Sequence, residues 1–550
     1  MHQPSTEPRR SIYHTYRVHP AAPVPAGGTD DAPVVIVGAG PIGLVTALDL
    51  AQRGVRCVLL ESELQVSEGS RAIVFTRRSM EILQQVGADA AVTRQGLPWR
   101  FGNSFYGTRR VYRMEAPYDA HDRFLPMINL QQQVLEEALV ELIGAQPRVA
   151  LRWGHRVVGV RDTGDGVALE VDTPAGAYTQ RCGWLIACDG ARSAVRQLQG
   201  LKMEGDAYEG RFVIADIRVD LPLPTERLAY FDPPWNRGNT VLMHREPHGI
   251  WRVDYQLPPG ETPEQALAPE SLKARIDAQL ALIGAAGAPW TLDWSSVYSA
   301  RAMTLPAYLN GRVLYCGDAA HLLPIFGVRG ANTGFQDSQN LGWKLALVVQ
   351  GVAGRALLDT YSTERVAAAR EIVGEAGRST RFMTPPTRGF RLLRDATLSL
   401  SLTQEFVRPL FHWRTSRPHE YLASPLNSPE DDDRLFDAGP RTGAPMVNVR
   451  LDADRYLMDA RAAGFTLLWF GTAEALPADV ADAARAWRAR GVALALTCID
   501  PGQADVWQRY GVRSGGAAYL LRPDQHVCAR WFAVTPHRLD RAMRAALALA

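Results

Sequence analysis

Three short segments carry residues that could bind a nucleotide, and each follows an apolar stretch. The first is glycine-rich, with Gly38, Gly40, Pro41 and Gly43 directly after 34–37. Glycine permits a tight turn and a close approach of backbone N–H groups to a diphosphate, and the start of a helix adds partial positive charge. An ordinary strand-to-helix turn is the alternative. The strand before the glycines and the helix after them favour a dinucleotide site.

A carboxylate lies at the spacing that such a site needs. A buried-strand pattern ends at Glu61, about twenty residues after the glycines, where an acidic side chain accepts hydrogen bonds from a ribose hydroxyl. Arg71 is a candidate phosphate contact because an arginine fork pairs bidentately with phosphate, whereas Arg77 and Arg78 fit solvated helix-surface positions better. Gln131 could offer its amide near the start of a further helix.

The other two segments join aspartate to glycine after a buried strand. Asp189 and Arg192 follow the apolar run 184–188, and Gly317 and Asp318 follow a similar run from residue 311. Each of these segments therefore predicts a buried strand that ends in a polar turn.

The elements that must position these residues change along the chain. Paired strands are predicted over 149–171 with a turn at 164–166, and a glycine loop at 326–334 leads into an amphipathic helix at 335–350. Strand-like alternation with Pro-rich turns over 212–297 predicts a second, mainly β domain. From about residue 464 a strand, a helix, three strands and a closing helix predict a small α/β domain.

One strand of the β domain carries two charges on one face. In 251–256 the residues alternate, so Arg252 and Asp254 share a face opposite Trp251 and Val253. Such a pair can be a solvated surface, and the residues alone leave that alternative open. His244, Tyr230 and Trp235 are weaker pocket candidates.

Composition narrows the function classes. The 550 residues include 60 basic and 58 acidic ones that are interspersed, so no broad charged field favours nucleic acid or an anionic membrane. Six cysteines show no C-x-x-C pair and no metal-ligand spacing, which favours buried reduced thiols and no metal site. No signal-peptide or membrane-span pattern is present, so we expect a cytoplasmic protein with a polar surface arm at 1–32.

Taken together, the segments resemble the single-component flavoprotein aromatic hydroxylases of the p-hydroxybenzoate hydroxylase family over about 34–365. The glycine motif, Cys188–Ser193 and Gly317–Pro324 occur in the order of that family. Gly330–Gly334, Asn340–Ala346 and the C-terminal unit are most similar to the 3-(3-hydroxyphenyl)propionate hydroxylase type. The tail has no C-x-x-C motif, so a structural or dimer-forming role is expected there.

The resemblance implies an α/β (α+β) fold: a Rossmann-like FAD-binding domain with an inserted, mainly β substrate domain and a C-terminal thioredoxin-like domain. The expected division is an arm at 1–32, the FAD-binding domain at 33–205 and 301–375, the substrate domain at 206–300, a connecting region at 376–445, and the thioredoxin-like domain at 446–550.

The resemblance also implies one FAD and a nicotinamide donor, NADH or NADPH, that binds only transiently. A single dinucleotide fingerprint agrees with that expectation. The helix after the glycine loop would point its N-terminus at the flavin. The cofactor-binding residues so implied are Gly38, Gly40, Pro41, Gly43, Glu61, Arg71, Gln131, Asp189, Arg192, Gly317, Asp318, Gly330, Ala331 and Asn332.

The implied reaction is hydroxylation of a phenol with O2 and NAD(P)H through a flavin C4a-hydroperoxide. By resemblance, Arg252 contacts the flavin, Asp254 contacts the substrate and accepts or relays its hydroxyl proton, and Pro324 walls the site. Ile325 stands where the family often has a second proline. His321 follows the flavin-binding Gly-Asp pair and is predicted to be structural.

Several functions stay open at this point. The substrate could be a small phenol such as 3-hydroxyphenylpropionate, in aromatic catabolism, or a larger polycyclic or polyketide phenol. A flavin dehydrogenase without oxygen insertion, or a flavin-bound interaction protein, would carry the same cofactor motifs. A homodimer is expected by resemblance only.

Overall fold

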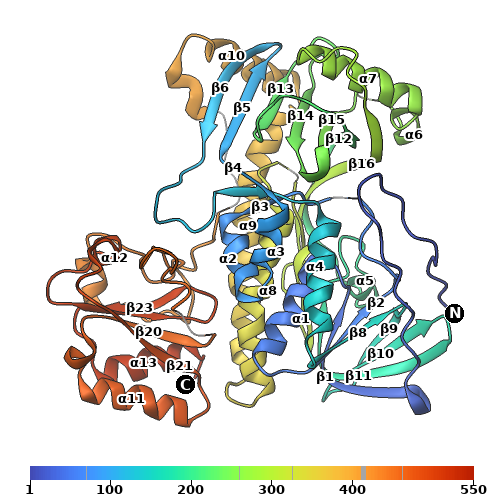
Figure 1. The fold of residues 1–550 in the computed structure, drawn as a ribbon. Coiled ribbons are helices and arrows are strands. Elements are labelled where there is room, and N and C mark those ends of the chain that lie inside the picture. The colour runs from blue at the N-terminus through green and yellow to red at the C-terminus, as the bar shows by residue number, and fades with distance from the viewer. Residues whose placement is uncertain (70, 259, 325, 411–416, 461–462, 550) are drawn as a thin grey trace.

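The computed structural model describes residues 1–69, 71–258, 260–324, 326–410, 417–460 and 463–549 (Figure 1). Its first domain is built on an eight-stranded sheet in which β1, β2, β8, β11 and β18 run parallel. The strands in the order of the sheet are β17 (Leu309–Asn310), β18 (Val313–Tyr315), β11 (Gly176–Ala187), β1 (Thr29–Val37), β2 (Cys57–Glu61) and β8 (Val149–Trp153), with β10 (Val167–Thr173) and β9 (Arg156–Asp162) added beside β11.

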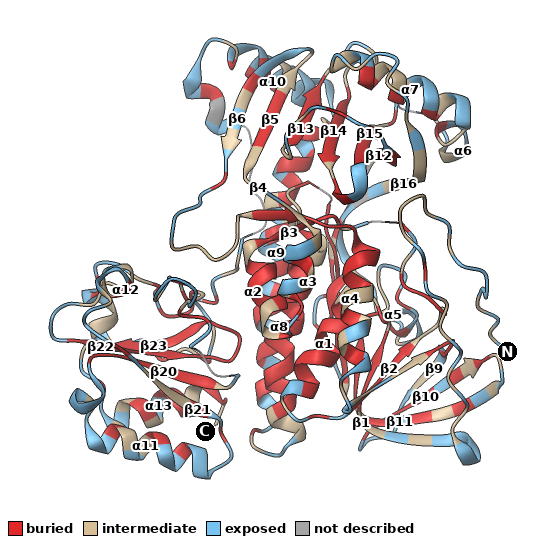
Figure 2. Cartoon of the chain, in the orientation of Figure 1, coloured by how far each residue is buried: buried red, intermediate tan, exposed pale blue. Residues whose placement is uncertain are grey.

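Helices cover this sheet, and most of α1 and α8 is buried (Figure 2). Their close packing depends on glycine, because a Cβ at Gly334 of α8 would come within 2.7 Å of Ile42 in α1. A three-stranded sheet of β3 (Val74–Thr76), β7 (Met127–Asn129) and β4 (Leu97–Trp99) lies at the junction with the second domain. The helices are α1 (Pro41–Gln52), α2 (Arg77–Gln85), α3 (Asp89–Gln95), α4 (Gln132–Gly144), α5 (Ala194–Leu198), α8 (Gly330–Val349) and α9 (Ala356–Met383).

Helix α8 begins five residues before its predicted start at residue 335, so Gly330, Ala331 and Asn332 form its first turn rather than part of a loop. The Asn332 side chain explains the early start. Its Oδ1 accepts hydrogen bonds from the Thr76 backbone N–H and from Ser79, and its Nδ2 donates to the Val74 carbonyl. These bonds tie the first turn of α8 to β3 and α2.

The second domain is an eight-stranded sheet of mostly antiparallel strands. The prediction assigned all of 33–205 to the first domain, yet β5 and β6 from that segment extend this sheet through the parallel pairing of β5 with β13. The order is β19 (His321–Leu322), β16 (Thr291–Thr304), β12 (Glu204–Arg218), β15 (Ile250–Gln256), β14 (Thr240–Arg245), β13 (Arg227–Phe231), β5 (Phe101–Tyr106) and β6 (Arg109–Glu115).

Each face of the second sheet has its own neighbours. On the outer face, Val253 and Tyr255 pack with Leu272 and Ile276 of α7 (Pro269–Leu282), which follows the short α6 (Pro263–Ala266). On the inner face, Phe212 and other apolar residues pack with side chains of the loop before α8, of α9 and of α10 (Arg388–Leu400). The inner face is therefore directed at the first domain.

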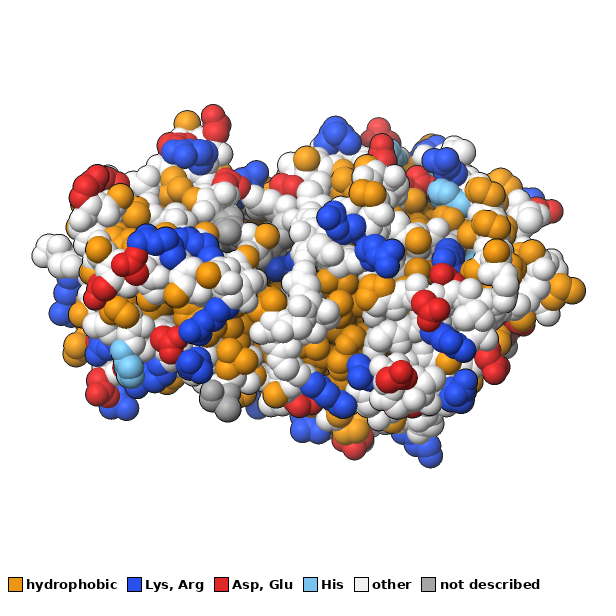
Figure 3. Space-filling model, turned by 90° about the horizontal axis from the view of Figure 1, so that it is seen from below, with side chains coloured by type: hydrophobic (Ala, Val, Ile, Leu, Met, Phe, Trp, Pro, Cys, Tyr) orange, Lys and Arg blue, Asp and Glu red, His pale blue; other side chains and the backbone are white. Residues whose placement is uncertain are grey.

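The C-terminal domain contains a four-stranded mixed sheet, which confirms the small α/β unit that was predicted from residue 464, although the short helix α12 between the second and third strands was not predicted. Hydrophobic side chains lie in the furrow between this domain and the rest of the molecule (Figure 3). In the buried core beneath, Trp343 of α8 meets Phe465 of the C-terminal domain edge to face, with ring centroids 5.6 Å apart. Its elements are β20 (Phe465–Phe470), α11 (Ala478–Ala489), β21 (Leu494–Ile499), α12 (Ala504–Arg509), β22 (Ala517–Leu521), β23 (Val527–Trp531) and α13 (Pro536–Ala546).

Buried charges join the C-terminal domain to α8 and α9. Arg522 donates to both carboxylate oxygens of Glu364 in α9, at 2.6 and 2.9 Å, and Lys344 of α8 donates to the same carboxylate at 2.7 Å. Because these groups are buried and paired, removal of one partner would leave an uncompensated charge.

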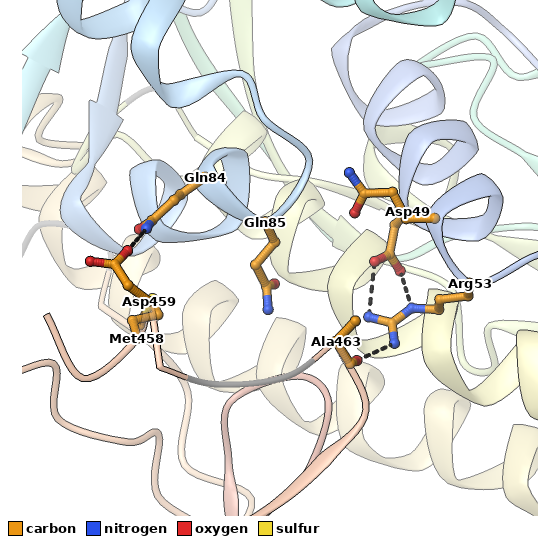
Figure 4. A pocket seen from close by; sticks show the side chains of 8 residues that line it. Asp49, Arg53, Gln84, Gln85, Met458, Asp459 and Ala463 are labelled. Carbon is orange, nitrogen blue, oxygen red and sulfur yellow. Dashed lines mark hydrogen bonds and ion pairs between the residues drawn. The ribbon is translucent and has the colours of Figure 1, made fainter. Parts of the chain in front are cut away.

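A small pocket lies at the same joint (Figure 4). It is lined by the end of α1, the end of α2, and Met458, Asp459 and Ala463, and several of its polar side chains are hydrogen-bonded. Arg53 pairs with Asp49 and donates to the Ala463 carbonyl, while Gln84 donates to Asp459. The pocket is at the C-terminal end of α1, whereas the glycine motif is at the N-terminal end.

The arm at 1–32 was expected to lie on the surface, and it does so for most of its length, although individual side chains anchor it to the rest of the protein. Tyr16 is buried, and its hydroxyl accepts a hydrogen bond from the Gly69 backbone N–H. The His19 ring stacks on Trp153 of β8 with centroids 4.5 Å apart. Within the part of the chain that the structure describes, no helix combines the length and the hydropathy that a membrane span requires.

Candidate active site

The predicted cofactor residues gather at one edge of the first sheet. Strands β2, β1, β11 and β18 are neighbours and run parallel, so their carboxyl ends meet at the same edge. Glu61 ends β2, Gly38 follows β1, Asp189 follows β11, and Gly317 follows β18. In open α/β sheets a ligand binds at this edge.

The glycine loop has the space that a diphosphate needs. Gly38 has φ +100°, and a Cβ there would lie 2.5 Å from the Cys188 carbonyl oxygen. A Cβ on Gly43 would lie 2.0 Å from the Gly38 carbonyl oxygen, so only glycine lets α1 pack onto the loop. A Cβ on Gly40 would meet nothing within 4 Å, and no side chain caps the start of α1 at Pro41. Open space and uncapped helix N–H groups fit a bound diphosphate of FAD.

Glu61 holds the glycine loop in place. Its Oε2 accepts a hydrogen bond from the Ala39 backbone N–H at 2.7 Å, and its Oε1 accepts one from the Glu63 backbone N–H at 3.0 Å. An ionised carboxylate has about four acceptor positions, so capacity remains for a ribose hydroxyl. The ribose contact of Glu61 stays a prediction.

The Asp-Gly segment after β11 contains Asp189, and two arginines follow it, Arg192 and Arg196, which have different surroundings. Asp189 Oδ2 accepts from the Val195 backbone N–H at the start of α5, while Oδ1 is buried without a described partner. The Arg192 side chain is exposed. Arg196, which the sequence analysis did not select, donates to the Ala319 carbonyl at 3.0 Å and so ties this segment to the turn after β18.

The turn after β18 presents the carboxylate of Asp318. Gly317 has φ +61°, a conformation that favours glycine, and its N–H donates to Asp337. The Asp318 residue is exposed at the sheet edge, yet the protein atoms crowded around its carboxyl raise the pKa of that group, and the nearby His321 and Arg71 lower it in part. Arg71 is exposed as well, and the cofactor contacts of both residues stay predictions.

Residue His321 is buried in a charge network, in agreement with its predicted structural role. Its Nε2 donates to Asp337 at 2.6 Å, and Arg365 of α9 donates to the other oxygen of that carboxylate, also at 2.6 Å. This carboxylate thus binds the Gly317 turn, a histidine and an arginine at once.

The N-terminus of α8 can act only through its backbone. The Asn332 side chain is fully engaged within the protein, so a flavin contact through that amide is ruled out by its existing bonds. A Cβ on Gly330 would meet nothing within 4 Å, and the first turn has no side-chain cap and no acidic residue. Such a helix end favours a negative charge, including that of a reduced flavin.

Gln131 was predicted to contact the cofactor, and part of the hydrogen-bonding capacity of its amide is used within the protein. Its Nε2 donates to the Pro247 carbonyl of the second domain at 3.1 Å, and its Oε1 is buried without a described partner. Gln131 therefore joins the start of α4 to the 247–249 turn, and its oxygen and its second N–H remain for a ligand.

Arg252 and Asp254 lie on the inner face of the second sheet and are buried, not solvated. Arg252 donates from Nε and Nη2 to the two oxygens of Asp216, each at 2.8 Å, and lies 3.4 Å from Glu246. Leu242 and His244 of β14 are in register with Asp254 and Arg252. Since directly opposed residues share a face, these side chains form one polar cluster.

Several atoms of this polar cluster lack partners in the described chain. Asp254 Oδ1, His244 Nδ1 and both carboxylate oxygens of Glu246 have no hydrogen bond there, although Glu246 Oε1 lies 3.4 Å from Arg252 Nε. Buried polar atoms are nearly always hydrogen-bonded, so atoms of this kind on one sheet face indicate a binding surface for a polar ligand.

Burial changes the proton affinities of the polar cluster. It raises the pKa of Asp254 to about 7, with Asp216 adding to the effect and Arg252 opposing it. Burial and the Asp216 charge place the pKa of Glu246 well above its ordinary value. Burial, with Arg227 and Arg252 nearby, places the pKa of His244 well below its ordinary value. A carboxyl that titrates near neutral pH suits general acid–base work.

Beside the polar cluster the inner face is apolar and aromatic. Phe212, Phe231 and Leu242 pack with Phe326 from the loop before α8, and the Phe212 and Phe326 rings meet edge to face at 5.3 Å. Pro324 is buried two residues before Phe326. The expectation about Ile325 lies outside the described residues. An aromatic ligand could therefore lie on an apolar surface with a hydroxyl at the polar cluster.

Part of the polar cluster is not apparent from the sequence. Asp216, Glu246 and Arg227 were not selected, and His244 was ranked low, because only strand pairing brings them to Arg252. Tyr230 and Trp235, also ranked low, belong to the outer side of the sheet with α7. The sequence does carry one signal for this cluster: polar and charged residues stand at alternate positions within the strands that the cluster spans.

Comparisons with known proteins identify the family. The model of the "FAD binding domain" family matches residues 31–376. A 3-(3-hydroxy-phenyl)propionate/3-hydroxycinnamic acid hydroxylase of Mycobacterium sp. (strain JLS) is 31% identical over 93% of this chain and 91% of its own.

Two solved structures are similar to this chain over 94% of its length. The flavin-dependent monooxygenase PieE, with FAD and substrate, has a TM-score of 0.80 at 24% identity, and the match covers 94% of this chain and 99% of its own. This similarity shows that the two proteins share a fold. Aklavinone-11 hydroxylase with FAD and aklavinone has a TM-score of 0.75 at 26% identity, with the same coverage. The chain therefore belongs to the FAD-binding domain family and, within it, to the FAD-dependent aromatic hydroxylases.

Proposed function

We propose that this hydroxylase acts on a phenol that lies against the inner face of the second sheet, with its hydroxyl at Asp254, and that NADH or NADPH supplies the electrons. One observation carries the proposal: Asp254 has a buried oxygen without a described partner, at the boundary between the polar cluster and the aromatic surface around Phe231. A phenol is the ligand class that matches both surfaces.

The residues of the chain then divide the work as follows. FAD, when bound, supplies the redox chemistry that activates oxygen. Asp254 in its ionised form accepts the phenol proton, which makes the ring electron-rich at the positions ortho and para to the oxygen. Arg252 is bound to Asp216 and so orients the cluster rather than donating freely to a ligand.

Aromatic side chains have a second task, which is to exclude water. Phe212, Phe326 and Pro324 border the place where the ring would react, and the α8 N-terminus lies in the same loop region. A dry site strengthens the electrostatic interactions within it and protects reactive oxygen species from water.

For the substrate class we favour a single-ring phenol with a short acidic side chain. The support comes from the relatives named as 3-(3-hydroxy-phenyl)propionate/3-hydroxycinnamic acid hydroxylases, which match almost the whole chain. A polycyclic phenol is the second candidate, because aklavinone-11 hydroxylase shares the same three-domain architecture over 94% of the chain.

The place and assembly of the enzyme belong to the same proposal. We propose a cytoplasmic homodimer without a nucleic-acid or membrane partner, on the family resemblance and the interspersed surface charge. Size-exclusion chromatography with light scattering would test the assembly, and a mass of one chain would refute it.

The reaction is tested with the purified yellow protein. NADH and NADPH oxidation is measured across a panel of monohydroxylated aromatics, including 3-hydroxyphenylpropionate and polycyclic phenols, while hydroxylated product and hydrogen peroxide are quantified together. Acceleration by one phenol, with product equal to NAD(P)H consumed, supports the proposal. Oxidation that ignores every phenol, or yields only peroxide, contradicts it and favours a dehydrogenase.

A further inference from the structure

The N-terminal arm reaches the junction between the two domains at Tyr13. The Tyr13 hydroxyl accepts a hydrogen bond from Gln133 Nε2 of α4 at 2.5 Å. On the other side, the Tyr13 ring stacks on His248 of the second domain, with centroids 5.4 Å apart and planes at 15°. Tyr13 therefore contacts both domains at once.

Gln131 forms a second contact across the same junction. Its amide donates to the Pro247 carbonyl, one residue before His248. Two glutamines at the start of α4 thus hold the 247–249 turn, one directly and one through Tyr13. We name this arrangement of Tyr13, Gln131, Gln133 and the 247–249 turn the arm clasp.

Neighbouring residues of the arm are fixed to both domains. Ser11 Oγ and the Ile12 backbone N–H donate to the Asp293 carboxylate of the second domain, at 2.8 and 2.6 Å. His14 lies 3.1 Å from Glu137 of α4 in the first domain. These contacts on either side set the position of Tyr13 along the junction.

The 247–249 turn leads directly into the strand of the proposed site. The Glu246 backbone N–H donates to the Ile250 carbonyl at 2.8 Å, which closes the turn, and His248 adopts φ +64°. Arg252 and Asp254 follow on β15. A shift of the turn would therefore move Glu246 directly and the start of β15 with it.

The environment keeps Tyr13 a neutral phenol. Burial raises its pKa, and the carboxylates of Glu246, Asp216 and Asp293 raise it further. A neutral hydroxyl accepts from Gln133 and keeps its own proton, so it adds no charge to the neighbouring polar cluster.

We propose that Tyr13 is a positioning residue for hydroxylation: through the arm clasp it fixes the 247–249 turn against α4 and so fixes Glu246 and the start of β15 relative to the cofactor residues. This inference rests on the proposed function for its effect on turnover. A looser junction would misplace the substrate hydroxyl and admit water, so NAD(P)H oxidation would yield more peroxide and less product.

The test uses the full chain with FAD bound. Tyr13→Phe removes only the hydroxyl, and Tyr13→Ala removes the stacked ring as well. Tyr118→Phe and Tyr118→Ala are matched controls, because Tyr118 is 40% exposed. Three quantities are measured: hydrogen exchange of the 246–254 backbone without substrate, KM and kcat for the phenol that the panel identifies, and the peroxide share of NAD(P)H consumed.

We expect Tyr13→Phe to raise KM by about threefold to tenfold, the effect of one lost hydrogen bond, and Tyr13→Ala to raise it further. Exchange in 246–254 and the peroxide share should rise in the same order, with bound FAD unchanged. Wild-type values for exchange, KM and peroxide in both Tyr13 variants would overturn the inference. A lower Tm with unchanged exchange and KM would overturn it too, because it would show a structural role alone.

Failure of the proposed function gives a different result. In that case wild-type protein forms no hydroxylated product with any phenol. Hydrogen exchange of 246–254 needs no turnover, so it still decides whether Tyr13 holds the turn. Increased exchange in Tyr13→Ala supports the arm clasp, and unchanged exchange refutes it.

Discussion

Replacement of Asp254 by Asn gives the sharpest test of how the polar cluster works. Asn has nearly the same shape as Asp, so the buried side chain stays in place while the ionisable oxygen is lost. Since no predicted cofactor residue is changed, bound FAD should remain at the wild-type level. Turnover that is coupled to the phenol should fall by about 10²- to 10⁴-fold, the usual contribution of a general base.

The pKa of Asp254 sets the size of the expected pH effect. Burial raises that pKa to about 7. The ionised fraction of such a group grows about tenfold between about pH 6 and about pH 8, whereas a free phenol titrates near pH 10. We therefore expect kcat/KM for the phenol to rise about tenfold across this interval in the wild type and to lose that rise in Asp254→Asn.

Stability gives an independent check on the same carboxyl group. A pKa raised in the folded state means that the folded chain binds the proton more tightly than the unfolded chain. The free energy of unfolding should therefore decline as the pH rises from about 4 toward about 7, and Asp254→Asn should lack that part of the decline. A flat pH profile of kcat/KM in the wild type, or the same rise in the Asn variant, would refute the assigned role.

Other substitutions test the cofactor edge, the charge network and the aromatic surface. Gly40→Ala should leave the Tm of the FAD-free chain unchanged but should weaken FAD binding, measured by titration, at least tenfold. Gly43→Ala should also lower the Tm, because its Cβ would lie 2.0 Å from a carbonyl oxygen. Equal FAD affinity in Gly40→Ala would contradict the diphosphate site. Asp337→Asn leaves Arg365 buried with a weaker partner and should cost about 3–5 kcal/mol of unfolding free energy, measured by denaturant titration; a loss within error of zero would refute the network. Phe231→Ala should weaken phenol binding, followed by flavin absorbance, and raise the peroxide share; unchanged binding would exclude Phe231 from the site.

Local sequence pattern was sufficient for much of the fold. The strand–glycine–helix order at β1 and α1, the hairpin turn at 164–166 and the strand Phe465–Phe470 appear where periodicity and turn residues predicted them. Each of these elements is specified by neighbours within a few residues, so the sequence shows it directly.

Pairing between strands that are far apart in the sequence could not be predicted. Strands β5 and β6 join the second sheet through contacts more than a hundred residues away, which no local pattern reveals. The polar cluster likewise depends on Asp216, His244 and Arg252 meeting across three strands. For the cofactor residues, the glycine turns were predictable, but the engagement of the Asn332 side chain with β3 required the packed structure.

The arm shows a different limit. Residues 1–32 lack an apolar run and lie largely on the surface, as expected, but the sequence did not predict that single side chains anchor the arm to both domains. Tyr13 and Tyr16 bind through individual hydrogen bonds and ring contacts, and such contacts carry no periodicity.

In the proposed reaction, one atom of molecular oxygen enters the phenol. Turnover under oxygen-18 gas with the phenol that accelerates NAD(P)H oxidation, followed by mass spectrometry of the product, tests this step. We expect one labelled oxygen in each hydroxylated product, with product equal to the NAD(P)H consumed. An unlabelled product, or consumption of NAD(P)H with label only in peroxide, would contradict it.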